Sequence, residues 1–142
     1  MRIYLLRHGI AEEGFGKPDS ERNLTSDGRK KLREVLRVAR AADVRPSVIL
    51  SSPYNRAVQT AQVAKEDLGC DGEILMSSAF TPMSREQDAW DEIRVHKGVE
   101  QLLVASHEPL MSGLSAFLLN APGLHVDFKK AGMLAIDIGT LG

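Results

Sequence analysis

The sequence predicts an α/β fold of three layers, in which helices cover both faces of a mainly parallel sheet. Short apolar runs, typical of strands buried on both faces, alternate along the chain with longer segments whose apolar residues recur at helical spacing. Such alternation indicates parallel strands, because each parallel pair needs a crossover connection. The short connection before the last apolar run fits an antiparallel strand at one edge of the sheet.

Five runs are predicted to be strands. The first has four consecutive apolar residues and stops abruptly on Arg-His-Gly. A run of this length is too short to show the periodic pattern of a helix. The fourth is the clearest buried strand of the five, and a histidine follows the serine at its end. The predicted strands are residues 3–6, 48–50, 73–76, 101–106 and 132–138.

Four segments are predicted to be helices. Thr25 or Ser26 can cap the first, whose apolar stripe includes Leu32 and Leu36. Gly69 is expected to end the second. In the third, Ala89, Trp90, Ile93 and Val95 are expected to form the buried face, and in the fourth Leu110, Leu114, Phe117 and Leu118. The helices are placed around residues 29–39, 57–68, 84–97 and 110–118.

Length and composition restrict the classes of protein that this chain can belong to. With 142 residues we expect one domain over residues 1–142. A net charge of −1 gives no basic surface for nucleic acid. The single cysteine, Cys70, rules out an internal disulfide and has no nearby histidine to activate it. We find no signal peptide or membrane-spanning run, and therefore expect a cytoplasmic protein.

Three of the predicted strands end on residues that suit an anion site. Arg7 and His8 follow the first, a Ser-Ser-Pro turn leads from the second to Arg56, and His107 follows the fourth. Carboxyl ends of parallel strands meet at one edge of a sheet, so these side chains can share a pocket. Two guanidiniums favour a phosphoryl group over a generic anion, because each planar fork can hold two oxygens. Taken alone, the Arg-His pair could equally be a surface turn.

As a set, these residues resemble the histidine phosphatase superfamily, which has the phosphoglycerate mutase-like fold. The matching motifs occur in the same order over nearly the whole chain. They are Leu-Arg-His-Gly at residues 6–9, Leu-Thr-Ser-Asp-Gly at 24–28, Ser-Ser-Pro-Tyr-Asn-Arg-Ala-Val-Gln-Thr-Ala at 51–61 and Ser-His at 106–107. The resemblance implies that His8 becomes phosphorylated, that Arg7, Arg56 and His107 hold the phosphoryl oxygens, and that no metal or cofactor takes part.

The chemistry of these residue types agrees with that division of roles. A neutral imidazole, with a reference pKa of about 6.5, can attack phosphorus through its free lone pair. A backbone carbonyl near Gly9 could accept the other ring N–H of His8 and fix its tautomer. The arginines would stabilise charge on the transferring phosphoryl group. For His107 the alternative is a structural histidine in the core.

A proton donor for the leaving group is harder to identify. In the mutase branch of the superfamily a glutamate follows the third strand, but residues 78–82 here read Ser-Ala-Phe-Thr-Pro and hold no carboxylate. Glu108 stands where the acid phosphatase branch has an aspartate, so it is a candidate donor. Glu12 and Glu13, in the loop beyond His8, are further candidates. Each of the three could instead be a surface carboxylate.

Within the superfamily the chain is most similar to the SixA-type phosphohistidine phosphatases. Only 50 residues separate Arg56 from His107, which leaves no room for the helical lid of the mutase relatives. An open site could admit phosphohistidine on another protein, such as a phosphocarrier or signalling domain. One alternative is a phosphomonoesterase for a small phosphoester, such as a sugar phosphate or nucleotide. Another is a non-catalytic module that binds phosphate or phosphohistidine.

Overall fold

The computed structural model describes residues 1–139, whose strands form one five-stranded sheet. Its strands are β1 (Arg2–Arg7), β2 (Val48–Ser51), β3 (Ile74–Met76), β4 (Gln101–Ser106) and β5 (Met133–Asp137). Their order across the sheet is β3-β2-β4-β1-β5. The first four are parallel, and β5 pairs antiparallel with β1 at the edge. The predicted mainly parallel sheet with an antiparallel edge strand is confirmed.

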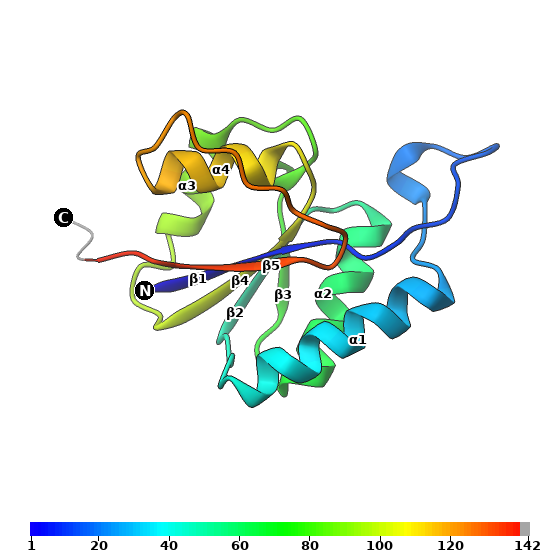
Figure 1. Cartoon of the computed structure of the whole chain (residues 1–142), viewed down its shortest axis with the longest axis horizontal. Helices are drawn as coiled ribbons and strands as arrows, with labels where there is room; N and C mark the ends of the chain where they lie inside the picture. The colour runs from blue at the N-terminus through cyan, green and yellow to red at the C-terminus, as the bar shows by residue number, and fades with distance from the viewer. Residues whose placement is uncertain (140–142) are drawn as a thin grey trace.

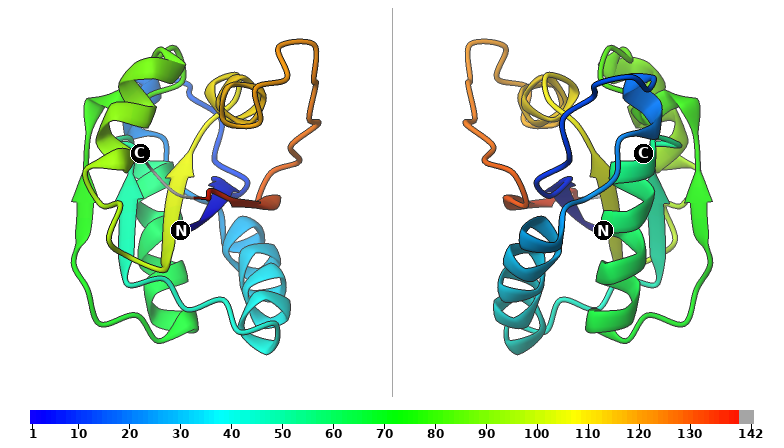
Figure 2. Two further views of the ribbon diagram at one scale, coloured as in Figure 1. Left: turned by 90° about the vertical axis from the view of Figure 1, so that its left-hand side faces the viewer. Right: turned by 90° about the vertical axis from the view of Figure 1, so that its right-hand side faces the viewer.

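Helices cover both faces of this sheet (Figure 1). The α-helices are α1 (Ser26–Ala41), α2 (Asn55–Leu68), α3 (Glu86–Arg94) and α4 (Leu110–Leu118), and two short 3₁₀ helices are η1 (Asp19–Glu21) and η2 (Ser78–Phe80). The pair α1 and α2 lies on one face, and the pair α3 and α4 lies on the other. Between α4 and β5 a long segment leaves the helix layer and returns to the edge of the sheet (Figure 2). Within residues 1–139 no helix combines the length and the apolar character needed to cross a membrane.

The central strands are buried on both faces, as their continuous apolar runs predict. In β1, Tyr4 and Leu6 pack in the core beneath α1 and α2, whereas Ile3 and Leu5 pack in the core beneath α3 and α4. Successive side chains of a strand point to opposite faces, so one apolar run supplies both cores. Full burial of such a side chain contributes about 1.5–3 kcal/mol.

The predicted caps at Thr25 and Gly69 agree with the structure. Thr25 caps α1, since its Oγ1 accepts a hydrogen bond from the Gly28 amide at 2.9 Å. Gly69 ends α2 with a φ of 68°, a left-handed conformation that glycine adopts without steric cost.

The predicted third and fourth helices differ in detail from those observed. Ala89 and Ile93 are buried, but α3 ends at Arg94 and the Val95 that follows is 74% exposed. Ile93 and Val95 are two residues apart, a spacing that does not place side chains on one helix face. Phe117 of α4 is exposed beside a hollow between α3 and α4. Both side chains therefore lie outside the core.

The sheet brings three strand ends to one edge. In the parallel register Arg7 lies beside Ser106, and Ser51 lies beside Ala105. The residues that follow these positions, His8, His107 and the turn leading to Arg56, therefore leave the sheet at neighbouring points.

Candidate active site

His8 directly follows β1, and its ring is held by the next residue. Its Nδ1 lies 2.7 Å from the carbonyl oxygen of Gly9. Because a carbonyl only accepts, Nδ1 carries the proton of the neutral ring and Nε2 keeps its lone pair. The Gly9 amide donates in turn to Oγ1 of Thr60 at 3.2 Å. The expected carbonyl contact is thus found, and it leaves the lone pair of Nε2 free.

Arg56, in the first turn of α2, faces Nε2 of His8. Its Nε donates to Nε2 of His8 over 3.4 Å. Its two terminal nitrogens donate to Asp19, Nη1 to the backbone carbonyl at 2.7 Å and Nη2 to the carboxylate at 3.1 Å. The Arg56 side chain is only 6% exposed, so solvent screens its positive charge little.

Arg7 ends β1 and is oriented by the segment that precedes β5. Its Nη1 donates to the carbonyl of Phe128 at 2.6 Å. The Ala131 amide bonds the carbonyls of Arg7 and His8, each at 3.1 Å, which ties this segment to the strand end. The Nε of Arg7 is buried and has no hydrogen-bond partner within residues 1–139. Arg7 therefore has donors left for an anion.

His107 completes the group at the end of β4. Its ring centroid lies 5.1 Å from that of His8 and 5.1 Å from that of Tyr54. Its Nε2 is 2.7 Å from the hydroxyl of Ser52, and its Nδ1 is buried with no hydrogen-bond partner among the residues described. The structure therefore brings together His8, Arg56 and His107, while Arg7 reaches the same strand end.

Burial keeps both histidines neutral. It lowers the pKa of His8 to about 4, against the hydrogen bond to the Gly9 carbonyl, which raises it, and the charges of Arg56 and Arg7 lower it further. Burial, followed by the nearby His8 and Arg56, lowers the pKa of His107 to about 3. At neutral pH the site thus holds a lone pair on His8 beside fixed positive charge, which suits attack on a phosphoryl group.

Comparison with known proteins identifies this arrangement. The family model described as histidine phosphatase superfamily (branch 1) matches residues 3–78. A phosphohistidine phosphatase SixA homolog from Haemophilus influenzae is 32% identical over 127 residues, which cover 83% of this chain and 77% of that protein. The chain belongs to the histidine phosphatase superfamily. It is accordingly an enzyme, a hydrolase of the histidine phosphatase type.

Other members of the superfamily show the same relationship. Phosphohistidine phosphatase SixA of Escherichia coli is 29% identical over 120 residues, 83% of this chain and 74% of that protein. A structure of the protein histidine phosphatase SixA complexed with tungstate has a TM-score of 0.87 at 27% identity, covering 97% of this chain and 88% of that one. A mycobacterial glucosyl-3-phosphoglycerate phosphatase shares the fold at 16% identity, with a TM-score of 0.75 over 96% of this chain and 89% of that one.

The superfamily match and the geometry overlap only in part. The matched residues include Arg7, His8 and Arg56, whereas His107 lies beyond them. His107 reaches the site because β4 pairs parallel with β1 along its full length. The parallel sheet, rather than proximity in sequence, brings this residue to the candidate site.

Two of the three candidate proton donors are bonded elsewhere. Glu108 accepts a hydrogen bond from the backbone amide of Ser112 at 2.7 Å and another from the Ser112 hydroxyl, so both carboxylate oxygens are engaged at the start of α4. Glu12 pairs with Lys17 at 2.5 Å within its loop. Glu13 is exposed. A donor role for Glu108 remains a prediction that would require it to leave Ser112.

Two contacts at the site were not predicted from the sequence. Asp19 binds Arg56, although the segment around it shows only loop character in the sequence. Tyr54 packs edge-on against His107, and the Arg56 guanidinium carbon lies 5.2 Å from the Tyr54 ring centroid. Arg22, three residues on, pairs with Asp19 at 2.9 Å, but no local feature of the sequence indicates that Asp19 meets Arg56.

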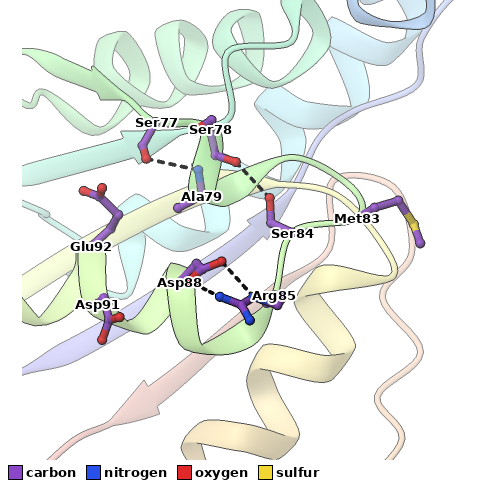
Figure 3. Close-up of a pocket in the computed structure, with 9 residues that line it drawn as sticks. All are labelled: Ser77, Ser78, Ala79, Met83, Ser84, Arg85, Asp88, Asp91 and Glu92. Atoms are coloured by element: carbon purple, nitrogen blue, oxygen red, sulfur yellow. Dashed lines mark hydrogen bonds and ion pairs between the residues drawn. The ribbon is translucent and has the colours of Figure 1, made fainter.

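A separate hollow of about 480 Å³ lies beside η2 and α3 and differs in character from the candidate site around His8 (Figure 3). Asp88, Asp91 and Glu92 line it, and its one arginine, Arg85, is paired with Asp88 at 3.1 Å. The acidic lining of this hollow disfavours binding of a phosphoryl group. The strand ends around His8 are therefore the better candidate for a phosphate site.

Proposed function

We propose that the protein removes the phosphoryl group from phosphohistidine on another protein, through a covalent phospho-His8 intermediate. The observation that carries this proposal is the neutral His8 ring, whose Nδ1–H is bound by Gly9 and whose Nε2 faces Arg56. In this arrangement the nucleophile needs no base, because its lone pair is already free. Arg7, Arg56 and His107 would hold the phosphoryl oxygens.

The reaction takes place in two transfers. The lone pair of His8 Nε2 forms a bond to phosphorus as the P–N bond of the substrate breaks, and that electron pair goes to the departing imidazole nitrogen. Water then attacks phosphorus, the bond to Nε2 breaks, and inorganic phosphate leaves. A substrate imidazole can take up a proton from solvent on its second ring nitrogen before it departs. The first transfer therefore places little demand on an acid, which fits a site where Glu12 and Glu108, two of the three candidate donors, are bonded elsewhere.

Two observations support a protein substrate. Relatives named phosphohistidine phosphatase SixA or its homolog match this chain at 29% and 32% identity. In addition, the residues between Arg56 and His107 form α2, β3, η2, α3 and β4. This interval therefore contains no large helical insertion that could cover the site. A phosphorylated side chain on a phosphocarrier or signalling domain could then approach the strand ends directly.

The substrate class can be tested by comparing two kinds of substrate. We expect kcat/KM for a phosphohistidine-bearing phosphocarrier domain to exceed that for a panel of sugar phosphates and nucleotides. Preference for one small phosphoester would favour the phosphomonoesterase alternative, which uses the same site. Binding of the phosphocarrier without turnover would favour a non-catalytic module. The His8→Ala protein serves as the control for contaminating phosphatase.

A further inference from the structure

The contact between Asp19 and Arg56 joins an exposed loop residue to a buried member of the site. Asp19 lies in η1, and its side chain is 57% exposed, against 6% for Arg56. It accepts hydrogen bonds from both terminal nitrogens of the guanidinium, through its backbone carbonyl at 2.7 Å and its carboxylate at 3.1 Å. Asp19 thus binds the edge of the Arg56 guanidinium that its two terminal nitrogens form.

The opposite edge of the guanidinium faces His8. A guanidinium has five N–H donors and presents a second two-donor edge formed by Nε and the adjacent terminal nitrogen. In Arg56 the Nε–H points at His8 Nε2 over 3.4 Å, a long and weak hydrogen bond. Phosphoryl oxygens attached at His8 would meet this edge while Asp19 keeps the other.

We propose that Asp19 is a positioning residue, which holds one edge of the Arg56 guanidinium so that the other binds phosphoryl oxygens beside His8. This inference rests on the proposed function of His8 and Arg56. A flexible arginine side chain loses rotamer entropy when it is fixed in one geometry. Asp19 fixes Arg56 before substrate arrives, so less of this entropy is lost on binding.

Asp19 is itself held in place by a second arginine. Arg22 donates from Nη1 to the other carboxylate oxygen of Asp19 at 2.9 Å, and from Nε to the carbonyl of Glu12 at 2.8 Å. The hydrogen bonds from Arg22 and Arg56 lower the pKa of Asp19 and so keep it ionised. An ionised Asp19 accepts hydrogen bonds and cannot serve as the proton donor at neutral pH.

The test compares Asp19 with a carboxylate of the same turn. For Asp19→Ala we expect kcat/KM to fall about tenfold and the Kd for inorganic phosphate, measured by calorimetry, to rise by a similar factor. Asp19→Asn keeps an oxygen acceptor and should fall between the alanine variant and the unmodified protein. The control is Glu21→Ala, which removes the same charge from η1 at an exposed residue. We expect it to leave both constants unchanged.

Several outcomes would overturn the inference. Phosphate binding by Asp19→Ala as tight as that of the unmodified protein would show that Asp19 does not orient Arg56, and tighter binding would show that it competes with phosphate. Equal losses in Asp19→Ala and Glu21→Ala would show a general charge effect. A lower melting temperature with unchanged phosphate Kd would show a purely structural role. Failure of the proposed function is distinguishable, because the unmodified protein would then form no phospho-His8.

Discussion

Nδ1 of His8 and the carbonyl oxygen of Gly9 lie 2.7 Å apart, and this contact decides which ring nitrogen can react. The carbonyl requires a proton on Nδ1, so the lone pair of the neutral ring is on Nε2. That nitrogen is also the one that faces the Nε of Arg56. The lone pair left by the Gly9 contact and the positive charge of Arg56 are therefore both at Nε2 of His8.

Attack by His8 should persist well below neutral pH. Protonation of Nε2 removes the lone pair, and the pKa of His8 is lowered to about 4, first by burial and then by Arg56 and Arg7. As the pH falls from 7 to about 5 the nucleophile stays neutral, whereas a histidine with a pKa of about 6.5 would be mostly protonated. The measurement is an NMR titration of His8, together with kcat/KM against pH for an acid-stable phosphoester. A midpoint near 6.5 for His8 would contradict the burial argument.

Loss of the Arg56 guanidinium should remove catalysis and leave the fold intact. For Arg56→Ala we expect kcat to fall by about 100-fold or more, as for other preorganised donors to a developing anion. Phosphate binding, followed by calorimetry, should weaken as well. Arg37→Ala, which removes a guanidinium from an exposed position of α1, is the matched control and should change neither constant. Unchanged phosphate affinity in Arg56→Ala would rule out its role in the site.

For Glu108 the structure offers a capping role that makes a different prediction from proton donation. Its carboxylate bonds the Ser112 amide at 2.7 Å, so Glu108→Ala should lower stability by about 0.5–2 kcal/mol, as loss of a helix cap does. Glu108→Gln should keep kcat, since neither carboxylate oxygen is free. Chemical denaturation and steady-state kinetics measure the two effects. A drop in kcat for Glu108→Gln that grows as the leaving group worsens would restore the donor role.

Gly28 lies where α1 meets the loop after His8, and no side chain fits there. A Cβ at this position would lie 2.2 Å from the carbonyl oxygen of Ile10, a backbone atom that cannot turn aside. Gly28→Ala should therefore destabilise the protein by about 1–3 kcal/mol through overpacking. Gly98→Ala is the control, because a Cβ there meets nothing within 4 Å. Urea denaturation should separate the two; equal midpoints would mean that the loop yields at little cost.

Much of the fold could be predicted from the pattern of strands and from the residues at helix ends. Thr25 and Gly69 mark helix ends because cap chemistry is local, and the alternation of apolar runs with helical segments predicts a parallel sheet. The prediction of Val95 on a buried helix face is wrong, because the predicted helix extends past Arg94, where α3 ends. The assignment of residues 1–142 to one domain stays a prediction.

Contacts made by loops were harder to predict than those made by strand ends. His8 and His107 could be expected to meet because parallel strands align their carboxyl ends. Asp19 could not, because it reaches Arg56 from a loop without periodicity, and nothing local specifies its partner. The same limit applies to Glu108, whose contact with Ser112 depends on how α4 begins.

The most direct measurement of the central claim is to trap the phosphoryl group on the enzyme. The protein is mixed with a phosphocarrier domain radiolabelled on phosphohistidine, and the reaction is quenched within milliseconds and digested for mass spectrometry. We predict an acid-labile, alkali-stable label on His8 that forms before free phosphate appears and is absent from His8→Ala. Normal turnover by His8→Ala, or a label on another residue of this chain, would contradict the account.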